Sequence, residues 1–232
     1  FRSNRSTFCI IQMNHFEGNE NEVSTGTTIM AIRLKDCVVM GADSRSSAGV
    51  YVANRVADKI EQIDDRIFMC RSGSAADTQK IGRVIRAQLD QFRTMYGCEP
   101  IVRNAAALAK AIIYKYKDQL QAGIIIAGVD DVDGASIYEV TLGGSMFKQN
   151  VCLGGSGSTY IYGYVDSNYR PDMTPEEGEE FVRRAVQLAI SRDGHSGGIV
   201  RTAIIRKEDV TRKVLTERDF TKIGRASCRE RV

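Results

Sequence analysis

The order in which hydrophobic periods follow one another constrains the fold of this chain most strongly. Short apolar runs rich in β-branched residues come first, between residues 28 and 71. Two stretches with apolar residues at helical spacing follow, then more short runs, a further helical stretch and a last pair of runs. Because strands and helices come in groups rather than in strict alternation, the pattern predicts an α+β fold. Each sheet must cover its apolar face, so we expect two sheets packed face to face with helices outside.

The boundaries of the elements follow from the apolar runs and the turn residues between them. The runs predict strands at 28–34 and 37–42 as a hairpin, at 51–52 and 67–71 as a second pair, and at 123–129, 136–142, 147–153, 199–205 and 210–215. Helices are expected at 75–96, at 102–120 and from 175 to before 194. Gly97 is typical of a helix end. Thr174, Pro175 and Glu177 together predict a capping box at the start of the last helix.

Composition and charge exclude several classes of function. A hydrophobic content of 43% supplies a sizeable core. The 32 basic and 29 acidic residues nearly cancel, and no basic block is present, so a nucleic-acid partner is not expected. The longest clearly apolar run, 124–127, is far shorter than the roughly 20 residues of a membrane helix, so no membrane span is expected. The first residues also lack the apolar segment of a secretory signal.

The cysteines are spaced as single thiols. The six stand at positions 9, 37, 70, 98, 152 and 228, without a CxxC pair, so zinc and thioredoxin-type sites are not expected. Cys37, Cys70 and Cys152 lie in strand-like runs, which is typical of small buried thiols in a reducing compartment. The cytoplasm and nucleus are therefore the expected locations.

The two ends of the chain differ from its centre. Residues 1–26 are polar, lack clear periodicity and are interpreted as a loose leader. The first residue is Phe rather than Met, so a fragment or a trimmed chain is expected. Residues 223–232, IGRASCRERV, resemble a translated sequencing adapter and are interpreted as a non-native tail. One folded domain is expected over 27–222.

The common hydrolase and phosphate-binding motifs are absent from the sequence. His15 lies in the leader, and His195 is too close in the chain to Ser196 and Asp193 to form a Ser–His–Asp relay with them. No GxSxG, HExxH or GxxxxGK[ST] pattern occurs. Histidine-dependent hydrolysis and phosphate binding are therefore not expected.

A threonine remains as a candidate nucleophile. A Thr hydroxyl can be activated by the free α-amine of its own residue, whose pKa of about 7.7–8.0 suits a general base. This requires the Thr to be the first residue of the working chain. Thr27 follows Gly26 at the boundary between the leader and the first strand. Taken alone, a Gly-Thr-Thr triplet is a weak signal and is more typical of an ordinary turn.

From Thr27 onward the chain resembles the proteasome beta-type subunits, and most closely their caspase-like, post-acidic class. Six motifs in the same order carry the resemblance: GTTIMA at 26–31, GADSR at 41–45, ANRVADK at 53–59, CRSGSAADTQ at 70–79, GSGST at 155–159 and DGHSGG at 193–198. The resemblance implies an N-terminal nucleophile hydrolase fold, which is a four-layer αββα sandwich of two antiparallel sheets flanked by helices. It also implies a threonine endopeptidase that loses residues 1–26 by autocatalytic cleavage between Gly26 and Thr27.

The resemblance also implies roles for individual residues. The catalytic set by position is Thr27 as nucleophile, Lys59 beside its hydroxyl, Asp43 as the carboxylate of Lys59, Gly73 as the oxyanion donor, and Ser156, Asp193 and Ser196 as polar support. Arg45 matches a structural arginine, and the substrate-binding positions are Arg71, Ser46, Ser47 and Ala75. Arg71 implies cleavage after acidic residues, because a guanidinium pairs well with a carboxylate. Ala48 and Ala57 stand where relatives often have Thr, so a less polar pocket is expected.

Other interpretations of these residues and of the chain stay open. Asp43 and Lys59 could form an ordinary surface ion pair, and Arg45 could be a surface charge. Gly73 could be a plain glycine at a strand end, and Ser156, Asp193 and Ser196 could serve turns alone. The whole chain could be a non-catalytic ring subunit or an amidohydrolase of small amides on the same fold. The implied partners are other alpha and beta subunits in stacked seven-membered rings and unfolded polypeptide substrates. No metal or organic cofactor is expected.

Overall fold

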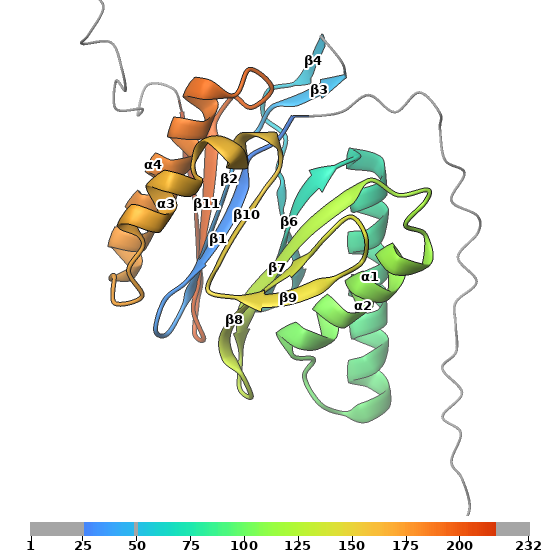
Figure 1. The fold of residues 1–232 in the computed structure, drawn as a ribbon. Coiled ribbons are helices and arrows are strands. Elements are labelled where there is room, and N and C mark those ends of the chain that lie inside the picture. Colours follow the sequence, from blue (N-terminus) through green and yellow to red (C-terminus); the bar gives the residue numbers. More distant parts are fainter. Residues whose placement is uncertain (1–25, 49–50, 217–232) are drawn as a thin grey trace, which may run out of the picture.

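The computed structural model describes residues 26–48 and 51–216 of the 232-residue chain (Figure 1). The strands are β1 (Ile29–Arg33), β2 (Val38–Ala42), β3 (Ser46–Ala48), β4 (Tyr51–Asn54), β5 (Ile60–Asp64), β6 (Ile67–Gly73), β7 (Ala122–Asp130), β8 (Gly134–Val140), β9 (Met146–Gln149), β10 (Val151–Gly154), β11 (Val200–Ile205) and β12 (Val210–Leu215). The helices are α1 (Ala75–Tyr96), α2 (Val102–Lys115), the 3-10 helix η1 (Ser156–Tyr160), α3 (Tyr162–Asn168) and α4 (Pro175–Arg192).

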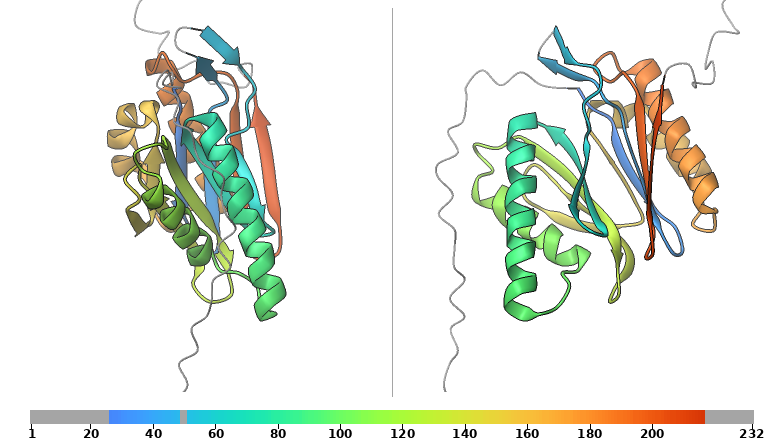
Figure 2. Two further views of the ribbon diagram at one scale, coloured as in Figure 1. Left: turned by 90° about the vertical axis from the view of Figure 1, so that its right-hand side faces the viewer. Right: turned by 180° about the vertical axis from the view of Figure 1, so that it is seen from behind.

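The strands form two antiparallel five-stranded sheets and one small hairpin. The first sheet has the order β10-β1-β2-β11-β12 and the second β5-β6-β7-β8-β9, while β3 and β4 pair with each other. The sheets face one another, α3 and α4 cover the outside of the first, and α1 and α2 cover the outside of the second (Figure 2). The predicted α+β sandwich of two sheets between helices is therefore confirmed.

The central strands are buried on both faces, which is why they appear in the sequence as continuous apolar runs. In β1, Ile29 and Ala31 pack between the sheets, whereas Met30 and Ile32 pack toward α4. This two-sided burial fills three apolar layers, one between the sheets and one beneath each pair of helices. The register holds β1 firmly between β2 and β10, so that the start of β1 has a fixed place.

The local end signals of the long helices are confirmed. The helix α1 ends at Gly97, whose φ of 64° is the left-handed conformation that glycine adopts readily. At the start of α4, Oγ1 of Thr174 accepts from the Glu177 N–H and the Glu177 carboxylate accepts from the Thr174 N–H. Both signals act within one helical turn, so they do not depend on the rest of the fold.

Several strand predictions were wrong. The strand at Tyr51–Asn54 pairs with β3, and the strand at Ile67–Gly73 pairs with β5 and β7, so the two do not form a pair. The strand β5 was missed because it lies at the sheet edge and carries polar residues between its apolar ones. The predicted strand 147–153 is two strands in different sheets. The chain bends at Asn150, so that β9 before the bend pairs with β8 and β10 after it pairs with β1.

Two helix predictions also need correction. The second helix ends at Lys115 instead of continuing to 120, because the chain must turn back to begin β7. Leu120 keeps the helical spacing because it is buried in the same apolar layer. The short elements η1 and α3 were not predicted, since they are brief and directly follow a glycine-rich turn.

The predicted single thiols are buried as expected. Cys37, Cys70 and Cys152 are free and buried, while Cys98 is free and exposed. Burial raises the pKa of the Cys152 thiol to about 12, so it remains protonated at neutral pH. Cys9 and Cys228 lie outside the described residues, as do 1–25 of the predicted leader and the predicted tail at 223–232.

No helix within the described ranges combines the length and the apolar character that crossing a bilayer requires.

Candidate active site

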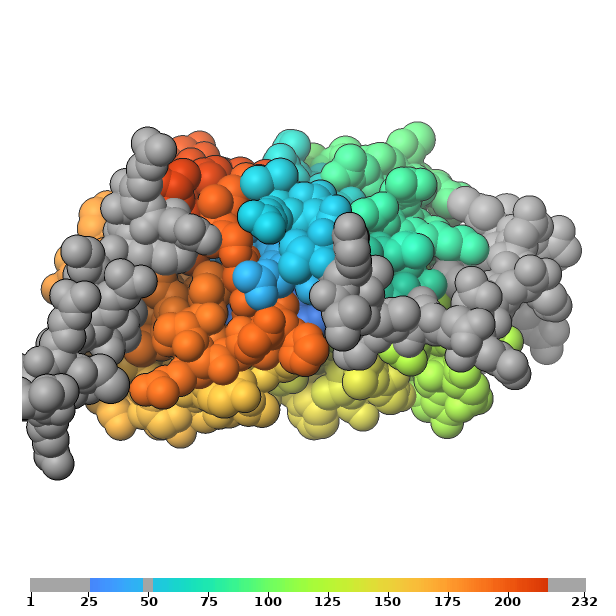
Figure 3. Space-filling model, turned by 90° about the horizontal axis from the view of Figure 1, so that it is seen from above, coloured from blue at the N-terminus to red at the C-terminus, as the bar shows by residue number. Residues whose placement is uncertain are grey.

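The sequence-predicted catalytic residues converge at one end of the sandwich, where the β3–β4 hairpin projects. Seen from above, blue atoms from the beginning of the described residues, cyan atoms from the region of β3 and β4, and orange atoms from the end of α4 and the segment after it lie next to one another (Figure 3). They meet because β1 begins here, β2 ends here and α4 ends here. Segments far apart in the sequence therefore supply one site.

Thr27, Lys59 and Asp43 form a buried chain of contacts. The Nζ of Lys59 donates to Oγ1 of Thr27 over 3.0 Å and to Oδ1 of Asp43 over 2.6 Å. Thr27 is 3% exposed, Lys59 7% and Asp43 0%. The pair of Lys59 and Asp43 is thus a buried ion pair that touches a hydroxyl, rather than an ion pair in solvent.

The carboxylate of Asp43 is fixed by backbone donors as well. The pairing of β1 with β2 continues for one residue and brings the Thr28 N–H to 2.9 Å from Oδ1 of Asp43. Its Oδ2 accepts from the N–H of Gly197 over 3.0 Å and from that of Arg45 over 3.3 Å. Four donors therefore hold this carboxylate in one orientation, and it in turn fixes the ammonium group of Lys59.

Opposing effects act on the pKa of Lys59. Burial lowers the pKa of this lysine, the carboxylate of Asp43 raises it, and the net direction is downward from the usual value. A lysine with a lowered pKa gives up its proton more readily than an ordinary lysine does. The arrangement can therefore move a proton to or from Oγ1 of Thr27.

The carbonyl of Gly26 lies next to the same hydroxyl. Oγ1 of Thr27 donates to the Gly26 oxygen over 2.8 Å, and Nζ of Lys59 donates to it over 3.3 Å. Gly26 also packs against the backbone of His195, where a Cβ built on Gly26 would lie 1.9 Å from the His195 Cβ. The Gly26–Thr27 peptide bond is thus held between the threonine hydroxyl, a lysine and a neighbouring loop.

Ser156, Asp193 and Ser196 form a second polar group, which contacts the nitrogen of Thr27. The Thr27 N–H donates to Oγ of Ser156 over 3.2 Å. Both serine hydroxyls donate to Oδ2 of Asp193, over 2.7 Å from Ser156 and 2.6 Å from Ser196. Burial would raise the pKa of Asp193, but the hydrogen bonds from Ser196, Ser156 and the His195 N–H outweigh it and lower that pKa. Asp193 is therefore ionised and fixes the serine that touches the Thr27 nitrogen.

Sequence reasoning missed Thr28 and Gly157 as members of this group. Oγ1 of Thr28 lies 2.8 Å from Oγ of Ser196. A Cβ built on Gly157 would lie 1.9 Å from Oγ1 of Thr28, so only glycine fits there. Their positions in the Gly-Thr-Thr and Gly-Ser-Gly motifs are the signal that could have identified them.

Arg45 holds the loop after α4 in place beside the site. Its Nη1 donates to the carbonyl of Gly194 over 2.9 Å. A Cβ on Gly197 would lie 2.4 Å from the guanidinium of Arg45, so the loop after α4 packs directly on this side chain. The contact ties the loop that carries Ser196 to the end of β2.

A cavity of about 280 Å³ opens beside Thr27. It is lined by Thr27, Arg45, Ser46, Asn54, Ala57, Asp58, Lys59, Arg71, Gly73, Ala75, Thr78 and Gln79. The predicted substrate residues Arg71, Ser46 and Ala75 therefore share one cavity with the nucleophile candidate, as does Gly73. Ser47 is buried in β3 and is not part of the lining, and the side chain of Ala48 lies outside the described set.

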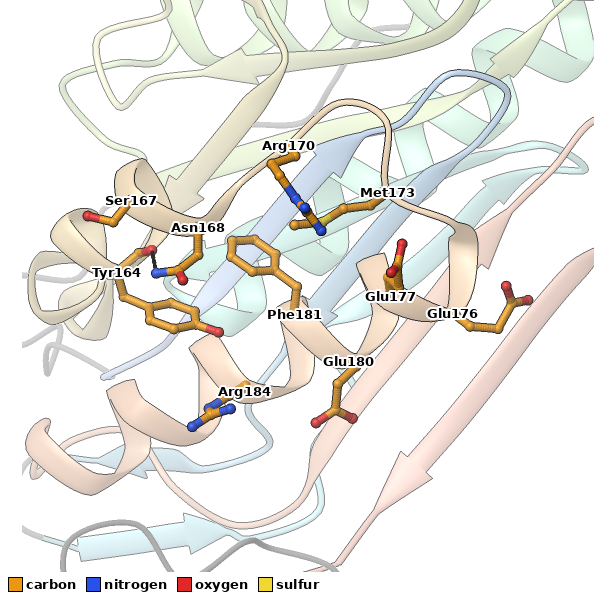
Figure 4. Close-up of a pocket in the computed structure, with 10 residues that line it drawn as sticks. All are labelled: Tyr164, Ser167, Asn168, Arg170, Met173, Glu176, Glu177, Glu180, Phe181 and Arg184. Carbon is orange, nitrogen blue, oxygen red and sulfur yellow. Dashed lines mark hydrogen bonds between the residues drawn. The ribbon is translucent and has the colours of Figure 1, made fainter.

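A larger hollow of about 680 Å³ lies elsewhere, between α3 and α4. It is lined by Tyr164, Ser167, Asn168, Arg170, Met173, Glu176, Glu177, Glu180, Phe181 and Arg184 (Figure 4). The rings of Tyr164 and Phe181, which both line this hollow, stack on one another with centroids 5.4 Å apart. None of the predicted catalytic residues lines this hollow, so size alone does not identify the reactive site.

The described part of the chain brings no three His, Cys, Asp or Glu side chains into an arrangement that could hold a metal ion. The candidate site consists instead of a hydroxyl, an ammonium group, carboxylates and backbone N–H groups. These groups can transfer protons and stabilise a negative oxygen.

Two facing antiparallel sheets between helical layers, with a threonine at the start of a central strand, define the N-terminal nucleophile hydrolase fold. Comparisons with known proteins then give the family. The family model for the proteasome subunit matches residues 23–205. This chain therefore belongs to the proteasome subunit family. Its similar relatives include beta-type subunits.

Three relatives illustrate the likeness. The proteasome subunit beta type-1 of Saccharomyces cerevisiae is 42% identical over 213 residues, which cover 92% of this chain and 99% of the relative. The proteasome subunit beta type-6 of Dictyostelium discoideum is 50% identical over 196 residues, covering 84% and 92%. The proteasome subunit beta type-9 of Rattus norvegicus is 46% identical over 194 residues, covering 84% and 88%. Because the type numbers differ, the likeness establishes a beta-type subunit and not one specificity class.

Proposed function

We propose that this beta-type subunit is a threonine endopeptidase that cleaves polypeptides after acidic residues once residues 1–26 have been removed. The observation that carries the proposal is the position of the Lys59 Nζ, 3.0 Å from Oγ1 of Thr27 and 2.6 Å from Oδ1 of Asp43. A subunit with a purely structural role has no need for a buried lysine held against a buried hydroxyl, because burying an ion pair brings little stability.

Maturation would use the same hydroxyl. The Thr27 oxygen attacks the carbonyl carbon of Gly26, the bond from that carbon to the Thr27 nitrogen breaks, and the nitrogen takes up a proton. The resulting ester between Gly26 and Oγ1 is hydrolysed by water, which releases the leader and leaves a free amine on Thr27. The contacts of Lys59 and Thr27 with the Gly26 carbonyl support this step, because they place a proton source beside the developing oxyanion.

Turnover would then use the new amine as general base. The nitrogen of this amine is the present Thr27 nitrogen, which contacts Oγ of Ser156. Asp193 in turn holds that serine hydroxyl. The amine takes the hydroxyl proton as Oγ1 attacks the substrate carbonyl, and that proton passes to the leaving amine when the peptide bond breaks. Water then hydrolyses the ester between the substrate acyl group and Oγ1, which releases the second product and restores the hydroxyl. Gly73 lines the cavity, and its backbone N–H is the proposed oxyanion donor. Loss of one such donor typically costs about 10²–10³ in rate.

Specificity would come from Arg71. This side chain lines the cavity that opens beside Thr27, and a guanidinium there would pair with a Glu or Asp side chain next to the cut. Ala57 lines the same cavity and contributes no hydroxyl. The backbones of Ala75 and Ser47 would align the extended substrate as an added strand, and Ser46 would bind it as part of the cavity lining.

As a proteasome subunit, the chain assembles with other proteasome subunits. We propose that it takes one place in a seven-membered beta ring stacked against alpha rings, with unfolded polypeptides as substrates. Free buried thiols fit an assembly that works in the cytoplasm and nucleus.

Mass spectrometry and kinetics on assembled particles test the proposal together. The subunit should begin at Thr27, and a Thr27→Ala variant should keep its leader and lose cleavage of post-glutamate peptides. Lys59→Met should reduce the cleavage rate by about 10²-fold or more, the scale of one missing proton-transfer group. An exposed threonine, Thr94→Ala in α1, is the matched control and should change neither readout.

The competing functions give different results in the same experiment. A non-catalytic ring subunit would be assembled with its leader intact and without any activity that depends on Thr27. A small-amide hydrolase would begin at Thr27 but would hydrolyse small amides and not peptides. A Thr27→Ala particle that still matured and cut would contradict the proposed mechanism itself.

A further inference from the structure

The guanidinium of Arg71 already faces a carboxylate of its own chain. Its Nη1 lies 3.3 Å from Oε2 of Glu61, and its Nη2 donates over 2.5 Å to the backbone carbonyl of Asp58. Oε2 of Glu61 is buried and has no hydrogen-bond partner among the described residues, so it meets Arg71 as an ion pair without a hydrogen bond. The Arg71 guanidinium is therefore held by a carbonyl and partly neutralised by Glu61.

Sheet register explains why these two side chains meet. Glu61 pairs with Met69 across β5 and β6, and Arg71 is the next residue of β6 on the same face. That face looks toward α1, where a Cβ built on Gly82 would lie 2.9 Å from Oε2 of Glu61. The helix thus limits the room of the Glu61 carboxylate on the side of α1.

The neighbouring charges have other partners. The carboxylate of Asp58 is paired with Arg212 at 2.8 Å, so Asp58 offers Arg71 only its carbonyl. Lys59 is paired with Asp43. Among the residues that the structure describes, Glu61 is thus the acidic side chain that offsets the positive charge of Arg71.

We propose that Glu61 is a fixed counter-charge that weakens the preference of this site for acidic residues by acting through Arg71. The inference rests on the proposed function, in which Arg71 receives the substrate carboxylate. An incoming Glu or Asp meets a guanidinium that already faces one negative charge, so its attraction is reduced. A neutral residue of similar size is unaffected. Glu61 therefore sets how strongly the subunit discriminates acidic from neutral residues.

Glu61→Gln tests the proposal in assembled particles, because it removes the charge and keeps the shape. The readout is kcat/KM for a post-glutamate and a post-leucine peptide, with the Thr27→Ala particle as the background for other subunits. The ratio of acidic to neutral cleavage should rise about two- to fivefold, the scale of a partly exposed ion pair. The rise in kcat/KM for the post-glutamate peptide should come from a lower KM with kcat unchanged, since the contact of the substrate carboxylate with Arg71 exists before and during the reaction.

A double-mutant cycle shows whether Glu61 acts through Arg71. In an Arg71→Met background, Glu61→Gln should leave the ratio unchanged, because the group through which it acts is gone. Glu208→Gln removes the same charge from an exposed turn and is the matched control. The proposal would be overturned if Glu61→Gln alone left the ratio of acidic to neutral cleavage constant or lowered it. It would also be overturned if Glu61→Gln raised this ratio equally in the Arg71→Met background. If the unchanged particle shows no Thr27-dependent post-acidic cleavage, it is the proposed specificity that fails instead.

Discussion

Gly157 lies so close to Thr28 that a Cβ at residue 157 would be 1.9 Å from the Thr28 Oγ1. The same hydroxyl meets Oγ of Ser196 at 2.8 Å. The start of η1 therefore supports the active-site serines by close approach of its backbone, which only a residue without a side chain allows.

Gly157→Ala should displace Thr28 or the start of η1 itself. Inserting one methyl group into such a packed place costs about 1–3 kcal/mol of unfolding free energy, and urea denaturation of the purified subunit measures it. Peptide cleavage by the assembled particle should also fall, because Ser196 loses its partner. Gly163→Ala in α3 is the matched control, since nothing lies within 4 Å of a Cβ there. Equal stability for both variants would contradict this account.

Gly26→Ala should slow maturation without harming the mature enzyme. The new Cβ would lie 1.9 Å from the Cβ of His195, so residue 26 must shift and its carbonyl must leave its place beside the Thr27 hydroxyl. A displacement of about 1 Å at a reacting group can cost about 10²-fold in rate. The measurement is the time course of leader removal, followed by mass spectrometry.

The mature fraction provides the internal check on the Gly26 prediction. Residue 26 leaves with the leader, so processed Gly26→Ala particles should cleave peptides at the unchanged rate per mature subunit. Gly143→Ala places a methyl group where nothing lies within 4 Å and should mature normally. Normal processing of Gly26→Ala would show that the contact with His195 does not position the scissile bond.

The elements with signals inside one turn were predictable from sequence. Gly97 ends α1 and Thr174 with Glu177 begins α4 as predicted, because these residues act on their own helix ends. The split of residues 147–153 between two sheets was not predictable in this way. It depends on β8 and β1 being available as partners, which no residue in the run itself encodes.

The residues of the candidate site also divide into those with a local sequence signal and those that depend on distant parts of the chain. Thr27, Lys59 and Asp43 come from separate segments and carry no local pattern, so only the resemblance predicted that they would meet. The structure brings them together through the pairing of β1 with β2 and the start of β5. The contact between Glu61 and Arg71 was missed because it depends on the register of β5 with β6.

The lowered pKa of Asp193 predicts how the stability of the subunit depends on pH. Burial opposes the ionised form, but hydrogen bonds from Ser196, Ser156 and the His195 N–H prevail, and the folded-state pKa lies below the ordinary 3.8. A carboxylate with a depressed folded pKa stabilises the folded state above its unfolded pKa. That contribution is lost as the pH falls through the folded value, because protonation then removes the preferred charge.

Asp193→Asn removes this contribution at every pH. The difference in unfolding free energy between the unchanged subunit and the variant should be constant above about pH 5 and should shrink as the pH falls below about 3.8. The slope can reach at most about 1.4 kcal/mol per pH unit, the value for one proton. Urea denaturation at a series of pH values from 7 to 3 measures the difference. If this difference in unfolding free energy stayed constant down to the lowest pH, the two serines would hold Asp193 no more tightly when it is charged. The charge of Asp193 would then not explain how Ser156 is held against the Thr27 nitrogen.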